Sequence, residues 1–262
     1  MILNRAIRIR IYPDSEQRHK IDVTLGHCRY IYNKMLERNT VIYKRRKEHL
    51  NYYAMQNLLP EMKKYLPWLK EADSQALKYA CRQVNNAFER FFHAQGGYPR
   101  FHSKRGKQSY TTTNTKNICI EPHKVKLPCL GWIRTPETRI PDGMICYATV
   151  IRESDARYYV SIAYKKEVPD AVAVVPKSEN VLGLDYKSDG LYTDSNGRTE
   201  NMPHFYRDAQ QKRTKLQRQL SKKQGSRKGE PKSRNFMKQL RKVNGQATHI
   251  ANQRRDYLHK LS

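Results

Sequence analysis

One carboxylate, Asp185, stands at the end of the short apolar run Val181–Leu184, and the polar residues after it lead to the turn signal Asp194–Gly197. Burying a lone carboxylate is costly unless it is paired, hydrogen-bonded or bound to a metal. Cleavage of a phosphodiester by two metal ions needs several carboxylates that converge on the ions, and a strand holds such a ligand in a fixed position. The residues alone leave two interpretations open: Asp185 is a metal ligand, or it caps a turn, which is the more frequent use of such an Asp.

A basic segment with interleaved aromatic residues, Tyr98–Tyr110 (YPRFHSKRGKQSY), is the second candidate. Aromatic rings stack on unpaired bases while Arg and Lys contact phosphates, so this composition favours a nucleic-acid contact. The alternative is an ordinary basic loop whose aromatic side chains pack on neighbouring strands, as we expect for Phe101. The candidate contacts are Tyr98, Arg100, Lys104, Arg105, Lys107 and Tyr110.

The charge of the chain indicates a polyanionic partner. Lys and Arg number 51 against 24 Asp and Glu in 262 residues, which gives a net charge of +27. Such a charge disfavours a compact state unless a polyanion neutralises it, and nucleic acid is the leading polyanion. A membrane surface is the weaker interpretation, because no segment reaches ~18 consecutive apolar residues. The N-terminus lacks the apolar core of a signal peptide, so we expect a cytosolic protein.

The last part of the chain carries about half of this charge. From Pro203 onward there are 17 Lys or Arg and three acids, in two predicted long helices of which the first spans about 203–223. The imbalance favours a phosphate backbone over simple solvation. The segment HIANQRRDYLHKLS adds Arg254, Arg255 and Lys260 as candidate contacts.

The five cysteines are scattered and form no C-x-x-C pair, so the sequence predicts neither a disulfide framework nor a zinc site.

The spacing of apolar residues along the chain predicts the strands and helices that position these candidate residues. Residues 5–12 alternate apolar and basic side chains as a strand does, and amphipathic helices are predicted over about 15–40 and 74–93. Short alternating runs follow, of which 144–164 reads as a hairpin. Because the first strand needs partners, the natural assembly is a small barrel with a helical block inserted after that strand. A new unit begins at Val181 with a strand, a turn and a second strand.

Five segments, taken together and in order, resemble the TnpB family of transposon-encoded, RNA-guided DNA endonucleases, which are similar to compact type V CRISPR effectors. The segments are IRIYP, YPRF-x-S-K-R, KLPCLGWI, VLGLDYKSDGLYTDSNG and IANQRRDYLHKLS. The resemblance covers essentially the whole chain.

The resemblance implies an α+β fold, in which a small wedge-like β-barrel with an inserted helical recognition domain precedes an incomplete RNase H-like (RuvC) domain with a basic helical hairpin. The implied boundaries are 1–13 and 96–168 for the barrel, 14–95 for the helical insertion, 169–180 for a linker and 181–262 for the N-terminal part of the RuvC domain.

The resemblance also implies partners and cofactors: a guide RNA from the transposon end, target double-stranded DNA beside a short motif, and Mg²⁺ at the nuclease site. It makes Asp185 the expected first RuvC metal ligand. By position, Tyr52, Lys78 and Thr115 are expected to help read the DNA motif. Sequence specificity in such proteins comes mainly from base pairing with the guide.

The family pattern places a second carboxylate after the DYLHKLS-type helix and a CxxC…CxxC zinc insert later, and these 262 residues contain neither. We therefore expect binding of guide RNA and target DNA, with cleavage only where a continuation or another chain supplies the remaining RuvC part. The alternatives are a cleavage-dead binding remnant or repressor, a decayed transposon gene, and an unrelated basic RNA-binding protein of ribosomal type.

Overall fold

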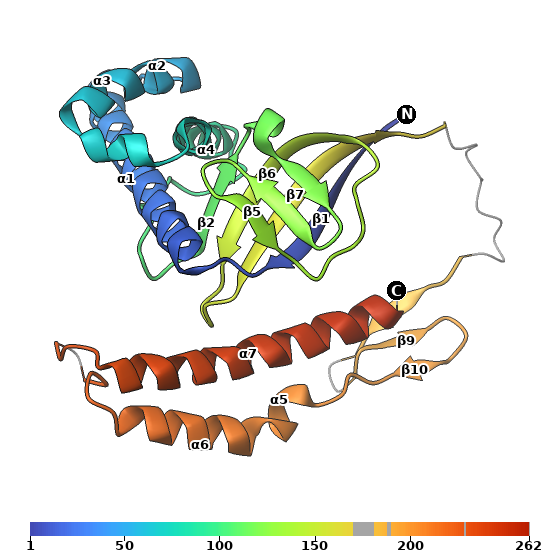
Figure 1. Cartoon of the computed structure of the whole chain (residues 1–262). Helices are drawn as coiled ribbons and strands as arrows, with labels where there is room; N and C mark the ends of the chain where they lie inside the picture. The colour runs from blue at the N-terminus through green and yellow to red at the C-terminus, as the bar shows by residue number, and fades with distance from the viewer. Residues whose placement is uncertain (170–180, 188–189, 228, 262) are drawn as a thin grey trace. The chain divides into compact units, whose positions relative to one another are not determined.

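The computed structural model describes residues 1–169, 181–187, 190–227 and 229–261 (Figure 1). The chain divides into two compact units, Met1–Pro169 and Asp170–Ser262, which are described separately. Apart from Pro169, the predicted linker 169–180 lies outside the described residues.

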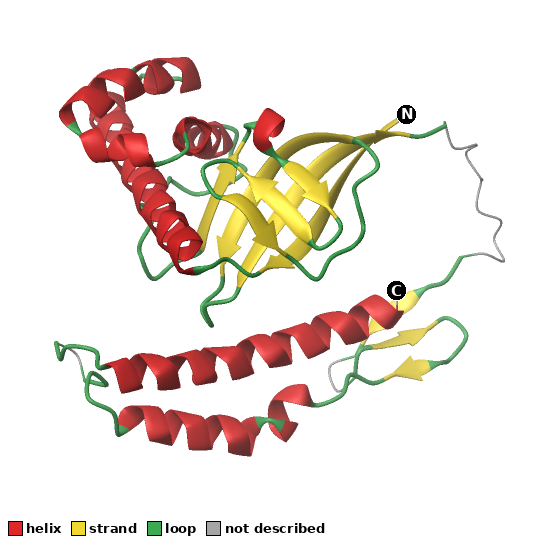
Figure 2. Ribbon diagram, viewed as in Figure 1, coloured by secondary structure: helices red, strands yellow, loops and turns green. Residues whose placement is uncertain are grey.

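Unit 1 contains two antiparallel sheets and a group of helices (Figure 2). Its strands are β1 (Ile2–Ile11), β2 (Gln108–Thr112), β3 (Cys119–Glu121), β4 (Lys124–Leu127), β5 (Gly131–Arg134), β6 (Met144–Arg152) and β7 (Tyr158–Glu167). Its helices are α1 (Ser15–Arg46), α2 (Tyr52–Asn57), α3 (Leu59–Tyr65), α4 (Ser74–Phe92) and the 3-10 turns η1 (Pro67–Glu71) and η2 (Thr115–Asn117).

The larger sheet has the order β1-β7-β6-β2, and β1 pairs with β7 from Ile2↔Glu167 to Ile11↔Tyr158. The alternation predicted for the first strand is present: Ile9 and Ile11 are buried, whereas Arg8 and Arg10 are exposed. The predicted hairpin is β6–β7, which pair directly.

The two sheets do not close into the predicted barrel. The smaller sheet has the order β3-β4-β5, and an isolated bridge, Tyr12↔Arg134, joins it to the end of β1. The hydroxyl of Thr135 donates to the carbonyl oxygen of Arg10 at 2.8 Å beside this bridge. At the other edge of the larger sheet, α1 and α4 pack against β2, so helices cover the edge that a closed barrel would pair with a strand.

Helix caps connect the helices to the sheet. Asp14 and Gln17 form a capping box at the start of α1, which runs to Arg46, beyond the predicted end at about residue 40. Asp73 caps α4 by accepting from the backbone N–H of Gln75 at 3.1 Å, and it also accepts from the hydroxyl of Thr112 in β2. One hydrophobic core therefore spans helices and strands of this unit.

Unit 2 contains a three-stranded antiparallel sheet in the order β10-β9-β8 and a helical hairpin. Its elements are β8 (Leu184–Tyr186), β9 (Tyr192–Asp194), β10 (Thr199–Glu200), α5 (Phe205–Asp208), α6 (Gln210–Ser221) and α7 (Arg234–Leu261). The helix predicted over 203–223 is thus interrupted at Ala209. Among the described residues of this unit, Phe236 and Ile250 are the buried large apolar side chains.

The strand that carries Asp185 is exposed, although the apolar run Val181–Leu184 that leads to it predicts a buried strand. Val181, Leu184 and Tyr186 are 64%, 60% and 78% exposed. The physical reason is that β8 lies at the edge of its small sheet and pairs on one side only within the described part of the chain.

No described helix has the length and apolar character needed to cross a membrane.

Candidate nucleic-acid interface

The basic loop, residues 98–107, joins α4 to β2 and presents its cations to solvent. Arg100, Lys104, Arg105 and Lys107 are all exposed, and no ion pair within the described residues engages them. Unpaired cations on one short segment suit a run of phosphates better than they suit solvation alone.

Two side chains of α1 contact the basic loop at His102, one through the backbone and one through the ring. Asn33 donates from Nδ2 to the carbonyl oxygen of His102 at 2.9 Å, and its Oδ1 accepts from the His102 N–H at 2.8 Å. The His102 ring stacks on Tyr32 with 3.7 Å between ring centroids. Burial, assisted by the charge of Arg29, lowers the pKa of His102, so the stacked imidazole is neutral at pH 7. The loop is therefore held in one conformation before a ligand arrives, which reduces the entropy that binding costs.

The aromatic residues of this segment differ in their surroundings. Tyr98 is an anchor: its hydroxyl donates to Thr40 Oγ1 at 3.1 Å and its ring packs edge-on against Phe88. Tyr110, which the sequence suggests as a nucleic-acid contact, is 5% exposed, because β2 packs against α1 and α4. Burial raises the pKa of its phenol. Phe101, expected to pack on the strands, is instead 62% exposed.

Of the three residues expected to read a DNA motif, Lys78 lies on α4, Tyr52 lies in α2, which packs against α4, and Thr115 lies in η2, which packs against β6. Tyr52 in α2 and Lys78 in α4 are half-buried, and Thr115 in η2 is exposed. The guanidinium of Arg82, one turn after Lys78, lies 4.8 Å from the centroid of the Tyr52 ring. Sequence reasoning missed Arg82, and its (i, i+4) spacing from Lys78 was the available signal.

The segment before Thr115 is also tied to α4. The hydroxyl of Thr113 donates to Gln75 Oε1 at 3.4 Å, which joins the end of β2 to the first turn of α4, three residues before Lys78. The structure thus joins two segments to α4: α2, which carries Tyr52, and the end of β2 at Thr113, two residues before Thr115.

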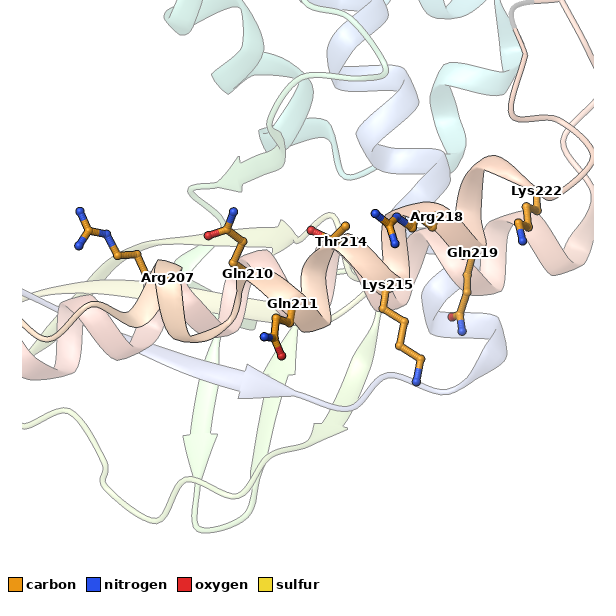
Figure 3. A pocket seen from close by; sticks show the side chains of 8 residues that line it. All are labelled: Arg207, Gln210, Gln211, Thr214, Lys215, Arg218, Gln219 and Lys222. Atoms are coloured by element: carbon orange, nitrogen blue, oxygen red, sulfur yellow. The ribbon is translucent and has the colours of Figure 1, made fainter.

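In unit 2, side chains of α5 and α6 line an open groove of about 770 Å³ (Figure 3). Figure 3 shows its side chains in two rows along the helices, at spacings of three and four residues. The rows are Arg207, Gln210, Thr214 and Arg218, and Gln211, Lys215, Gln219 and Lys222. The charge count predicted a basic hairpin, but sequence reasoning did not identify the individual residues that line this groove. Cations alternating with amides and a hydroxyl can donate to successive phosphates.

The candidates near the C-terminus lie on α7. Arg254 and Arg255 are exposed, and Arg254 also lines a hollow of about 590 Å³ beside His204 and Arg207. Lys260 forms an ion pair with Asp256 at 2.8 Å, so its charge is already partly compensated.

Asp185 faces a polar side of its small sheet. In the strand register it is opposite Thr193, which in turn is opposite Thr199, and the two threonine hydroxyls are 3.2 Å apart. The other side of the sheet carries Glu200, whose carboxylate accepts from the hydroxyl of Tyr257 in α7 at 2.6 Å. Asp185 therefore lies on the side of the sheet away from this contact.

Within the described ranges, no group of three or more His, Cys, Asp or Glu side chains could hold a metal ion. Asp194, close in sequence to Asp185, accepts from the backbone N–H groups of Asn196 and Arg198 and so serves the turn. Cys28 and Cys81 are buried, and burial raises the pKa of the Cys81 thiol to about 12, which makes it unreactive.

Two family models match the chain: a helix-turn-helix domain of the IS605 OrfB type over residues 1–48, and the IS605 OrfB probable transposase over residues 161–262. A protein of Escherichia coli (strain K12) named "Putative RNA-guided DNA endonuclease InsQ" is 30% identical over 98% of this chain and 62% of its own length. A protein of Streptomyces pristinaespiralis named "Putative RNA-guided DNA endonuclease" is 31% identical over 99% of this chain and 63% of its own length. The chain belongs to the TnpB family.

This TnpB-family chain spans less than two thirds of the length of these two relatives. Its fold is similar to that of a protein solved as a Cas12f1–sgRNA–target DNA complex, with a TM-score of 0.51 and 11% identity over 96% of this chain and 76% of the other. Residues 1–48 of the TnpB-family chain, matched by the helix-turn-helix model, contain the strand β1 followed by the single long helix α1.

Proposed function

We propose that this TnpB-family chain is a transposon-associated, RNA-guided DNA-binding protein. The observation that carries the proposal is the alignment of the two relatives named as RNA-guided DNA endonucleases with 98% and 99% of this chain. The net charge of +27 and the unpaired cations of the basic loop support it, because both suit a phosphate backbone.

In this proposal the two units bind different parts of the RNA–DNA complex. A wedge-like region consists of residues 1–13 and 96–168, and a helical recognition insertion consists of residues 14–95. These two parts of unit 1 together bind a guide RNA from the transposon end. Tyr52, Lys78 and Thr115, with Arg82 beside Tyr52, contact the DNA next to the guided sequence. Residues 181–262 correspond to the N-terminal part of a RuvC-type domain, whose basic hairpin follows the target double-stranded DNA or the RNA–DNA heteroduplex.

Asp185 fits the role of one divalent-metal ligand in that domain. Mg²⁺ keeps several waters and is often bound by one or two carboxylates together with phosphate oxygens, and the exposed carboxylate of Asp185 can supply one such bond. A pair of metal ions needs more carboxylates than the described residues gather around Asp185. When bound, the metal would polarise the scissile phosphate, while the part of Asp185 is to fix the position of the ion.

A second candidate function is binding without cleavage, as a repressor or competitor. It is favoured by the absence, among the described residues, of a group of three or more metal-ligating side chains, since a nucleic-acid surface needs no metal cluster.

The test of the proposed function is to express the chain beside the DNA that flanks its gene, purify it and sequence the RNA that accompanies it. We expect one discrete RNA that ends at the transposon boundary. If the chain makes ~6 phosphate contacts to single-stranded parts of this RNA, its affinity for the RNA should fall roughly 300-fold between 50 and 200 mM salt. A mixture of cellular RNA with no common end, or an affinity that salt leaves unchanged, would contradict the proposal.

A further inference from the structure

A second basic site lies in unit 1, away from the basic loop. Where β1 ends, α1 begins and β5 and the β6–β7 turn adjoin them, a pocket of about 610 Å³ opens. We call it the arginine pocket, and its defining residues are Arg10, Tyr12, Arg18, Trp132, Arg134 and Arg157. Its volume is within the usual range for a site that takes one small ligand.

The pocket carries more positive charge than its acids compensate. Of its four guanidinium groups, the one on Arg157 pairs with Asp155, and no ion pair in the described part of the chain engages Arg10, Arg18 or Arg134. The acid in the lining, Asp14, accepts from the backbone N–H of Gln17 at 2.8 Å as the cap of α1. An anion of one or two charges would therefore be held by several guanidinium groups at once.

Aromatic surface lies next to these charges. Tyr12 is 44% exposed and Trp132 is 40% exposed, so both rings present apolar surface that a stacked base could cover. The guanidinium of Arg10 lies 4.9 Å from the centroid of the Tyr12 ring, and the Lys124 ammonium lies 4.7 Å from that of Trp132. Rings and cations in one hollow match a base joined to a phosphate.

The walls of the pocket are held in place by hydrogen bonds from different segments. Gln17 Nε2 donates to the carbonyl oxygen of Trp132 at 2.9 Å, and Arg18 Nε donates to that of Pro13 at 2.8 Å. The Tyr12 N–H donates to the Arg134 carbonyl oxygen at 2.9 Å. The side chains thus start from a fixed frame, and a ligand has little backbone to order when it binds.

We propose that the arginine pocket binds one unpaired nucleotide of an RNA strand, with the base on Trp132 or Tyr12 and the phosphates on the guanidinium groups of Arg10, Arg18 and Arg134. The inference rests on the proposed function, whose RNA partner it locates. A nucleotide in a duplex keeps its base stacked between neighbours, so a pocket for one base and its phosphates favours a bulged, looped or terminal nucleotide.

The chain has two tryptophans, which allows a direct test. In a Trp68→Phe variant Trp132 is the remaining tryptophan, and we expect its fluorescence to be quenched saturably by an unstructured 5′-phosphorylated RNA hexamer. Adding Arg134→Ala should weaken this binding at least 10-fold, whereas adding Arg5→Ala, at an exposed position of β1 outside the pocket, should leave it unchanged. The proposal would be overturned if the hexamer did not quench the fluorescence, or if both arginine variants weakened hexamer binding equally. AMP that binds as tightly as the hexamer would also overturn it, in favour of a free nucleotide.

A second measurement needs no substitution, because Trp68 packs against His27 and Tyr30 and its replacement could disturb folding. Ultraviolet crosslinking of the chain to its co-purified RNA, followed by mass spectrometry, should give nucleotide adducts at Trp132 or Tyr12. Adducts confined to the basic loop or to unit 2 would overturn the pocket proposal and leave the proposed function standing. A chain that carries no discrete RNA but whose Trp132 responds to the hexamer would contradict the proposed function instead.

Discussion

Asn33 and His102 show how single contacts prepare the candidate interface. The paired hydrogen bonds of Asn33 and the stacking of His102 on Tyr32 fix the middle of the basic loop, which leaves Phe101 on one side and Lys104 on the other free to reach solvent. Neither Asn33 nor Tyr32 is marked by its sequence neighbourhood, because both occupy ordinary positions in a long helix.

The lowered pKa of His102 predicts a pH dependence of stability. The unfolded chain, with an ordinary pKa near 6.5, binds a proton here before the folded chain does, so this contribution is present above pH 6.5 and is lost as the pH falls below that value. Denaturant midpoints measured from pH 7.5 to 5 should therefore decline for the wild type and decline less for His102→Phe, which keeps the stacked ring but cannot titrate.

His27 supplies the internal comparison for this experiment. Burial lowers its pKa as well, so the double variant His27→Phe/His102→Phe should give the flattest profile of all. A His102→Phe profile as steep as that of the wild type would show that the stacked imidazole takes no part in the pH dependence.

At the scale of elements, the sequence predicts local pairing better than closure. The alternation of Ile7, Ile9 and Ile11 predicts β1 and its buried face, and the capping residue Asp14 predicts the start of α1, as the structure shows. Whether the sheets close, and whether Tyr110 is buried, depends on which elements pack against β2. The five residues of β2, QSYTT, do not reveal these neighbours. Exposure of β8 likewise depends on its neighbours, since the composition of Val181–Leu184 suits a buried strand.

The basic loop gives a prediction at this scale. Replacing Lys104, Arg105 and Lys107 with Ala should weaken RNA binding about 10-fold or more near 100 mM salt and lower the salt slope by about 2, because three phosphate contacts to a single strand are lost. Filter binding over a series of salt concentrations measures both quantities.

The matched control removes the same number of charges from lysines that form surface ion pairs: Lys20, Lys34 and Lys166 with Glu16, Glu37 and Asp142. If the control triple variant lowers affinity and slope as much as the loop variant does, RNA binding depends on net charge alone and the loop has no special role.

At the scale of the whole molecule, burial and charge are distributed unequally between the units. The continuous core lies in unit 1, whereas unit 2 combines few buried apolar side chains with a strongly basic hairpin. A surface with this excess of positive charge attracts polyanions.

The described residues gather no group of three or more metal-ligating side chains, and this leads to a prediction about activity. With Mg²⁺, its guide RNA and matching DNA, these 262 residues should bind the target without cutting it, since a single carboxylate does not hold a pair of metal ions. A gel assay for strand scission on guide-matched DNA checks this. Scission that is lost in Asp185→Ala and kept in Asp208→Ala, a change of an exposed acid in α5, would show a working nuclease instead.

The two ends of unit 1 meet. The Met1 ammonium donates to the carbonyl oxygen of Val168 at 3.0 Å, and the Val168 N–H donates to the Met1 carbonyl oxygen at 3.0 Å. A short loop could therefore join these ends and let the unit be circularly permuted, with new ends opened in an exposed turn such as residues 93–96. For the same reason, an affinity tag fused before Met1 would emerge beside the point where the chain leaves this unit, whereas a tag on a permuted chain could be placed on another side of the unit.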